Sequence, residues 1–211
     1  MFKYLIKLGA NYGKIGNLFP QFKSFSIMSK TYPGRILWLD MEMSGLDIDR
    51  DQIMEVACLV TDGDLNIVAE GPNIIVHQPD SVLDNMNEWC TKQHKQTGLT
   101  NESRSSTISL EEAEDQLFEF ISKNIAKNSS PIAGNSVYMD RLFLRKHMPR
   151  VNNYLHYRII DVSSIKELCR MWRPEIYKNA PTKHLQHRAL TDIIESVEEM
   201  KFYRDNFFKL D

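Results

Sequence analysis

Two carboxylates stand two residues apart at the end of an apolar run. Asp40 and Glu42 follow residues 36–39 (Ile-Leu-Trp-Leu), which are predicted to form a buried strand. Because side chains alternate along a strand with a period of two, both carboxylates point to the same side. Like charges this close raise each other's pKa unless a cation neutralises them, so the pair predicts a divalent-metal site. Acidic residues also follow strands simply as turn or cap residues, so the prediction depends on the residues downstream.

Two further acids and one histidine complete the set. Asp140 lies on the first turn of a predicted helix, where the helix dipole favours a negative charge even without a ligand. His187 and Asp192 lie on the last predicted helix, about 140° apart around its axis, so they would reach different parts of one cleft. Mg²⁺ prefers oxygen ligands and keeps part of its water, which suits these four carboxylates. Asp40, Glu42 and Asp192 are the first-choice ligands, and Asp140 is expected to hold a metal partly through water. His187 is the best candidate for a general base that activates an attacking water, because imidazole titrates near neutral pH.

Alternation and turn residues predict the elements that must position this set. Strands are expected at 36–39, 53–61, 67–68, 74–76, 131–133 and 159–161. Helices are expected at 85–96 with Gly98 as C-cap, after a capping box at Ser109, at 137–147 with Pro149 closing it, at 163–171 and at 185–208. Strands first, then helices alternating with short strands, indicate an α/β domain built on a mixed sheet.

The composition fits one globular domain in a reducing compartment. The 211 residues are 42% hydrophobic, which is enough for one full core. Cys58, Cys90 and Cys169 are an odd number without zinc-like spacing, so neither a disulfide framework nor a zinc site is predicted. No apolar run reaches about eighteen residues, so no membrane span and no membrane partner are expected.

Charge is distributed unevenly along the chain. Six of the 26 basic residues fall within residues 1–39, which contain no Asp or Glu, so the remainder carries 20 basic and 28 acidic residues. Long nucleic acids are bound mainly through phosphate contacts with a basic surface. The acidic remainder therefore predicts a short nucleic-acid ligand and no stable binding of a long one.

The basic segment, residues 1–33, resembles a mitochondrial presequence, although it is poorer in Arg than most. A disordered basic tail is the alternative. Met28 is a candidate second start, which would give a product without the presequence. We therefore expect the protein in the mitochondrion, with the cytoplasm or nucleus as additional locations.

The order of the acids and the histidine resembles the histidine branch of the DEDD 3′→5′ exonucleases. The stretches at 39–46 (LDMEMSGL), 133–137 (AGNSV), 161–163 (DVS) and 187–190 (HRAL) are similar to the oligoribonucleases within that branch. The resemblance covers about residues 34–208. It implies a 3′→5′ exonuclease domain over 34–211 with a ribonuclease-H-like fold, a mixed β-sheet flanked by α-helices. It further implies hydrolysis of very short RNA, especially dinucleotides, to 5′-mononucleotides with two Mg²⁺ or Mn²⁺ ions. The implied catalytic residues are Asp40, Glu42, Asp140, His187 and Asp192, of which the four acids are metal ligands.

The same resemblance implies how both ends of a short RNA are held. Leu46 and Trp89 match an apolar wedge and an aromatic face that sandwich the two bases, although Leu and Trp are usually core residues. His94 matches a position near the scissile end. Tyr157 matches a residue that reaches into the neighbouring subunit's site, which implies a homodimer. The implied 5′-phosphate pocket consists of Ser136, Arg158, Ser163 and Ser164, and its serines suit helix capping equally well.

Three other functions stay open from the sequence. The nearest is a general 3′→5′ exonuclease for single-stranded DNA or RNA, against which the acidic body and the phosphate-pocket residues argue. A phosphodiesterase for small dinucleotides or phosphoadenosine compounds would use the same chemistry. A nucleic-acid-binding protein without catalysis is the least expected, because all five catalytic residue types are present.

Overall fold

A five-stranded mixed sheet is the centre of the computed structural model, which describes residues 34–182 and 187–208. The strands are β1 (Ile36–Met43), β2 (Ile53–Thr61), β3 (Ile67–Ile75), β4 (Ile132–Gly134) and β5 (Ile159–Asp161). Their order is β3-β2-β1-β4-β5, with β1, β2 and β3 antiparallel and with β4 and β5 parallel to β1. The expected mixed α/β fold is therefore confirmed. The predicted presequence and Met28 lie outside the described residues.

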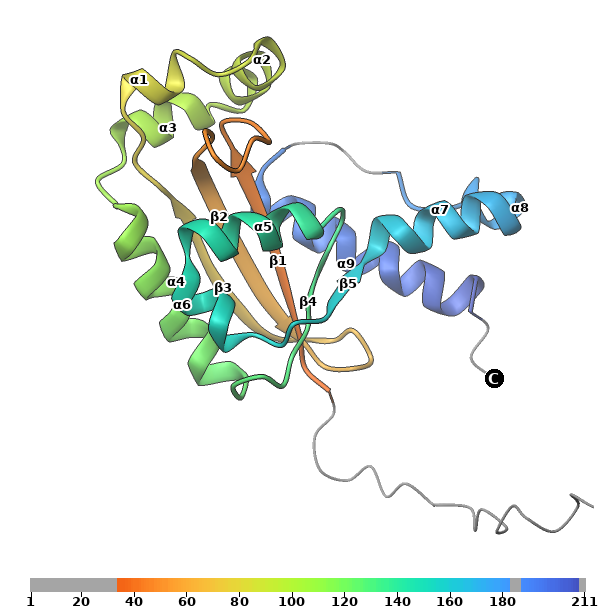
Figure 1. Ribbon diagram of the computed structural model, residues 1–211. Helices are drawn as coiled ribbons and strands as arrows, with labels where there is room; N and C mark the ends of the chain where they lie inside the picture. The colour runs from red at the N-terminus through yellow and green to blue at the C-terminus, as the bar shows by residue number, and fades with distance from the viewer. Residues whose placement is uncertain (1–33, 183–186, 209–211) are drawn as a thin grey trace, which may run out of the picture. The chain divides into compact units, whose positions relative to one another are not determined.

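Helices follow β3, β4 and β5 along the chain and cover the sheet (Figure 1). They are α1 (Asp80–Leu83), α2 (Glu88–Thr97), α3 (Leu99–Ser105), α4 (Leu110–Asn124), α5 (Tyr138–His147), α6 (Pro149–Tyr154), α7 (Val162–Trp172), α8 (Pro174–Tyr177) and α9 (Ala189–Asn206). None of the helices in the described ranges is long and apolar enough to cross a membrane.

Several element boundaries differ from those predicted. The strands expected at 67–68 and 74–76 are one strand, β3, whose pairing with β2 contains two register shifts. Pro149 does not simply end a helix, because it also begins α6 at a position where a missing N–H costs nothing. Gly98 does cap α2, with φ of 84°, and the Ser109 capping box does open α4. The last helix begins at Ala189, and residues 183–186 lie outside the described residues.

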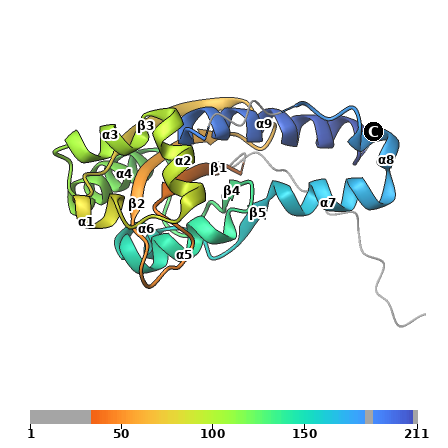
Figure 2. The same ribbon diagram turned by 90° about the horizontal axis from the view of Figure 1, so that it is seen from above.

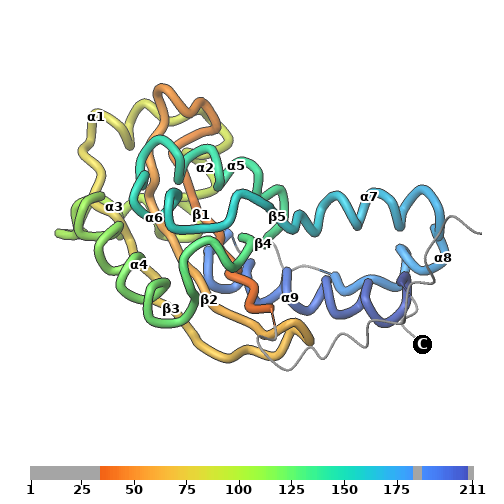
Figure 3. Tube along the Cα trace, turned by 60° about the horizontal axis from the view of Figure 1, so that its bottom comes forward, coloured from red at the N-terminus to blue at the C-terminus, as the bar shows by residue number. Residues whose placement is uncertain are grey.

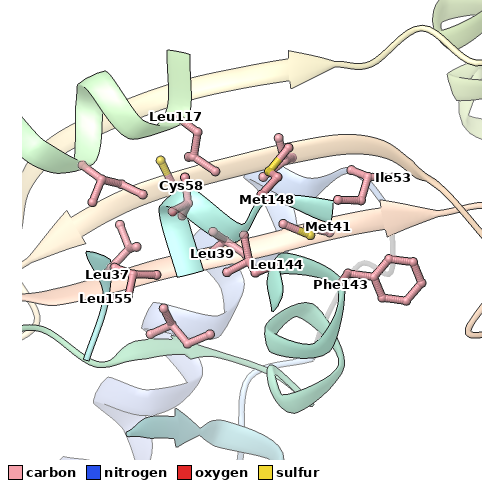
Figure 4. Packing of buried hydrophobic residues seen from close by; sticks show 14 of the residues in the cluster. Leu37, Leu39, Met41, Ile53, Cys58, Leu117, Phe143, Leu144, Met148 and Leu155 are labelled. Carbon is pink, nitrogen blue, oxygen red and sulfur yellow. The ribbon is translucent and has the colours of Figure 1, made fainter. Parts of the chain in front are cut away.

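One face of β1 supplies the larger core. Leu37, Leu39 and Met41 alternate along the strand and pack with Cys58 of β2 and residues of α4, α5 and α6. Figure 4 shows these side chains close to Phe143, Leu144, Met148 and Leu117. Burial of this face fixes the register of β1, because a slip of one residue would turn the apolar set outward.

The opposite face of β1 carries the acids. Trp38 packs into a second core with α7 and α9, and its indole N–H donates to Thr61 Oγ1 at 2.9 Å. Asp40 and Glu42 share the parity of Trp38, so they lie on the α9 side of the sheet. Figures 2 and 3 show α7 and α9 running side by side, and α9 also packs against β1 and β2. The fold therefore brings the last helix against the carboxylates of the first strand.

Candidate active site

The carboxylates of Asp40 and Glu42 lie on the part of β1 that extends beyond the end of β4. β4 pairs with β1 only as far as Trp38, so within the described residues no strand covers that side of β1 from Leu39 onward. A cavity of about 610 Å³ opens at this point. Its lining brings together seven of the predicted site residues, Asp40, Glu42, Leu46, Trp89, Ser163, His187 and Asp192.

The ionised form of Glu42 is destabilised by its surroundings. Its side chain is mostly buried, and burial together with the carboxylates of Asp40 and Asp192 raises the pKa of Glu42 to about 8. Glu42, Asp192 and His187 each offer a ligand atom, and these atoms lie within 4.8 Å of one another. A divalent cation at this position would replace mutual repulsion by attraction.

Asp140 joins the other acids from α5. Burial and the Asp40 carboxylate raise the pKa of Asp140, while hydrogen bonds from its own backbone and from the backbone of Met41 oppose the rise. Asp140 is 5% exposed and is not among the residues that line the cavity. Asp140 therefore lies near Asp40 and Glu42 but behind the open lining, and its part in holding a metal through water stays a prediction.

His187 lies just before the first turn of α9. Its backbone has φ of 48°, an unusual conformation for a residue with a side chain. Its imidazole meets the indole of Trp89 edge to face, with 5.5 Å between the ring centroids. The imidazole is therefore held at the cavity wall between an aromatic ring and the carboxylates.

Leu46 and Trp89 are displayed to solvent. Their exposed fractions are 66% and 60%, so they are not core residues. The loop of Leu46 is fixed by Asp51, whose carboxylate accepts hydrogen bonds from Ser44 Oγ at 3.2 Å and the Asp47 N–H at 2.9 Å. Gly45 allows this arrangement, because a Cβ there would lie 2.2 Å from Asp51 Oδ2.

His94 has different surroundings from the other predicted contacts. It is 1% exposed, its Nε2 lies 2.9 Å from the carbonyl oxygen of Met43, and its Nδ1 lies 4.0 Å from Glu42 Oε2. Since a carbonyl only accepts, Nε2 carries the proton, and burial lowers the pKa of this imidazole. The structure places His94 beneath the cavity as a neighbour of Glu42.

The predicted phosphate pocket is assembled only in part. Ser136 has φ of 52°, and its N–H lies 3.0 Å from both Asp161 Oδ1 and Ser163 Oγ. Asp161 also caps α7 by accepting from the Ser163 N–H at 2.9 Å. Arg158 and Ser164 are exposed and do not line the cavity.

Tyr157 is also outside the cavity lining and is 73% exposed. Its ring stacks on that of His156, and the Arg158 guanidinium lies 5.5 Å from the Tyr157 ring centroid. The side chain therefore lies outside the cores of the described residues.

Eight of the residues that line the cavity had no role in the sequence-based prediction, among them the polar residues Asn135, Lys166 and Ser196. Asn135 donates to Ser196 Oγ at 2.7 Å and accepts from Ser163 Oγ at 3.1 Å, which links α9 to Ser163 of α7. Helical spacing could have identified two of them. Lys166 lies one turn after Ser163 on α7, and Ser196 lies one turn after Asp192 on α9, so each shares a helix face with a predicted site residue.

Comparison with known proteins places this geometry in context. Residues 37–200 match the model of the family RNase_T, described as "Exonuclease". The chain is 54% identical over 175 residues to "Oligoribonuclease, mitochondrial" of Mus musculus, which covers 83% of this chain and 74% of that protein. It is 50% identical over 176 residues to "Oligoribonuclease" of Marinobacter nauticus, covering 83% of this chain and 97% of that protein.

Among solved structures, E. coli exonuclease I in complex with a 5cy-dT13 oligonucleotide superimposes with a TM-score of 0.63. The match has 19% sequence identity and covers 82% of this chain and 41% of that chain. At this identity the likeness supports the fold alone.

Proposed function

This chain belongs to the RNase T family of exonucleases, and we propose that it is an oligoribonuclease that hydrolyses very short RNA from the 3′ end, dinucleotides above all, to 5′-mononucleotides. The observation that carries the proposal is one cavity in which Asp40, Glu42, Asp192 and His187 face the exposed Leu46 and Trp89. Acids and imidazole suit phosphodiester hydrolysis, and the apolar pair suits base stacking.

The donor set fits divalent cations. The four acids offer carboxylate oxygens, which Mg²⁺ and Mn²⁺ accept as ligands. The pKa of Glu42 is raised by burial and by the neighbouring carboxylates, and a bound cation would offset both effects. We propose that Asp40, Glu42, Asp140 and Asp192 hold two such ions. When bound, the ions activate water, stabilise charge on the phosphate and neutralise the leaving 3′ oxygen.

The remaining steps fall to side chains of the chain itself. His187 is proposed to accept the proton of the attacking water, since its imidazole is held beside Glu42 and Asp192 at the cavity wall. Leu46 and Trp89 would clamp the two bases, and stacking of this kind tolerates any base.

The far end of the substrate is proposed to be closed by a 5′-phosphate pocket. Ser163 lines the cavity and contacts Ser136, and both hydroxyls are within reach of an anion at the start of α7. Arg158 and Ser164 would join them when substrate is present. A cavity of about 610 Å³ suits a small ligand better than a track for a long strand.

A homodimer and a mitochondrial location complete the proposal. Tyr157 and Ile159, next to and in β5, and Tyr138, at the start of α5, are exposed large hydrophobic residues, and β5 is one of the two edge strands of the described sheet. Such a surface suits a subunit contact through which Tyr157 reaches the neighbouring site. The name of the Mus musculus relative and the basic segment at residues 1–33 support the location.

The decisive measurement is turnover as a function of RNA length. We expect end-labelled RNAs of two to ten nucleotides to be cleaved only with Mg²⁺ or Mn²⁺, with kcat/KM highest for the 5′-phosphorylated dinucleotide. A general single-strand exonuclease would give kcat/KM that rises or stays level with length. If no RNA of any length released mononucleotides, the protein would not be a nuclease, and only the binding of nucleic acid without catalysis would remain as its function.

The phosphate pocket is tested by Arg158→Ala. Because a guanidinium binds phosphate through two parallel hydrogen bonds, we expect KM for the 5′-phosphorylated dinucleotide to rise by about 10–100-fold, which corresponds to 1.4–2.8 kcal/mol. Dinucleotide without the phosphate and the longest RNAs should lose far less. Arg145→Ala, an exposed cation of α5, is the matched control. An equal loss at all lengths would show that the pocket lies elsewhere.

A further inference from the structure

We propose that Arg188 is a positioning residue for catalysis, because it fixes His187 and the start of α9 over the cavity by bridging Glu55 of β2 and Glu102 of α3. This inference rests on the proposed function of His187 as the base. Arg188 does not line the cavity, so it is not proposed to touch RNA.

The guanidinium of Arg188 makes a two-sided clamp. Its Nε lies 3.2 Å from Glu55 Oε2 and its Nη2 lies 3.3 Å from Glu55 Oε1. On the other side Nη2 lies 2.9 Å from Glu102 Oε2, and Nη1 lies 3.3 Å from Glu102 Oε1. A planar group with donors on both edges can hold two carboxylates in fixed directions, which a lysine ammonium cannot do.

Glu55 requires its ion pair with Arg188 because its carboxylate is fully buried. Glu55 is 0% exposed and stands opposite Glu42 in the β1–β2 ladder. A fully buried carboxylate beside other acids needs a cation close by, and Arg188 supplies it. Glu102 is partly exposed and ties the same guanidinium to α3. The start of α9 is therefore anchored to two elements that are distant in sequence.

The anchor acts directly on the predicted base. His187 precedes Arg188, and its φ of 48° is a conformation that persists only where the surroundings enforce it. Trp89 restrains the imidazole from one side, and the Arg188 clamp fixes the backbone that carries it. The carbonyl of Arg188 also accepts the N–H of Asp192 at 3.0 Å, so the same residue starts the turn that presents Asp192.

The test uses a variant that leaves no buried charge unpaired. In Arg188→Gln/Glu55→Gln both charges are removed together, and we expect kcat on the 5′-phosphorylated RNA dinucleotide to fall about 10²-fold with KM changed by less than about threefold, because a misplaced catalytic group costs about that much. Arg188→Lys keeps the charge without the fork, so it should lie between this variant and the unmodified protein.

Arg104→Gln is the matched control, since Arg104 bridges Asp80 and Asp84 away from the cavity at 2.6 and 3.2 Å. We expect its kcat to stay within about twofold of the unmodified protein. Thermal melting of every variant shows whether it is folded.

A cycle with His187→Ala separates positioning from a general loss of structure. If Arg188 acts through His187, adding Arg188→Gln/Glu55→Gln to His187→Ala should lower kcat by less than about threefold. A further loss of about 10²-fold in that background would show that the clamp acts through another group, such as Asp192, and would overturn the assignment to His187, as would an unchanged kcat in the original background. Arg188→Lys answers the same question if the double variant does not fold. Each variant should also be measured on a ten-nucleotide RNA. If the enzyme proves not to prefer dinucleotides, the proposed function fails in that respect, but the ratio of variant to unmodified kcat on either RNA still tests the role of Arg188.

Discussion

Glu42→Gln is expected to lower metal-dependent turnover by about 10³-fold or more, because bound metals supply several kcal/mol of transition-state stabilisation and each 1.36 kcal/mol is tenfold. Gln keeps the shape of Glu but lacks the charge that binds a cation. Initial rates on the 5′-phosphorylated dinucleotide, with Mn²⁺ affinity by calorimetry, measure the two effects. Both should fall together.

The same variant should stabilise the metal-free protein. The pKa of Glu42 is raised from 4.5 to about 8 in the folded chain, so the folded state holds a proton that the unfolded state releases. The unmodified protein therefore loses stability as pH rises between these two values, and the Gln variant lacks this contribution of Glu42. In EDTA, we expect the Tm of Glu42→Gln to exceed that of the unmodified protein by roughly 5–10 °C near pH 9. The difference should shrink towards pH 5.

Glu70→Gln provides the control for this comparison. Glu70 is an exposed carboxylate on β3, so its replacement should change neither turnover nor the pH dependence of Tm. A Glu42→Gln protein that binds Mn²⁺ as tightly as the unmodified chain would remove Glu42 from the ligand set. A Tm difference independent of pH would show that Glu42 is not the group that titrates.

The acidic face of β1 could be predicted from sequence because it depends on local periodicity. Trp38, Asp40 and Glu42 lie on one side of β1 for the same reason that Leu37 and Leu39 lie on the other, and both facts follow from alternation along a strand. Boundaries were less predictable. β3 continues through Gly71 and Pro72, residues that usually end strands, because both fall at the register shift opposite residues 57–59 of β2, where neither has a ladder partner, and pairing resumes at Asn73.

Tertiary pairing was beyond the reach of sequence patterns. Arg188 meets Glu55 across 133 positions of the chain, and no periodicity or turn signal links the two. The burial of His94 under Glu42 likewise depends on how α2 packs beside β1, since a polar helix with one buried imidazole reads as a surface helix. Of the predicted phosphate-pocket residues, the structure joins Ser136 to Ser163, whereas the roles of Arg158 and Ser164 stay predictions.

His187→Ala should lower kcat by roughly 10²–10⁴-fold, the range that a general base contributes. Mn²⁺ affinity should remain within about threefold, because four carboxylates would still bind the ions. His187 nevertheless offers a nitrogen within 4.8 Å of the Glu42 and Asp192 ligand atoms, so the affinity measurement is needed to separate a base from a ligand. Single-turnover rates on the dinucleotide measure the chemical step without product release.

His77→Ala is the matched control, because His77 is an exposed histidine whose ring lies outside the cavity lining. Its kcat should stay within about twofold of the unmodified protein. If His187→Ala turned over RNA at the unmodified rate, water would be activated without the imidazole and the base assignment would be wrong. If the variant lost metal affinity in proportion to its rate, His187 would be a ligand, and the edge-to-face contact with Trp89 would serve to hold a metal-binding ring in place.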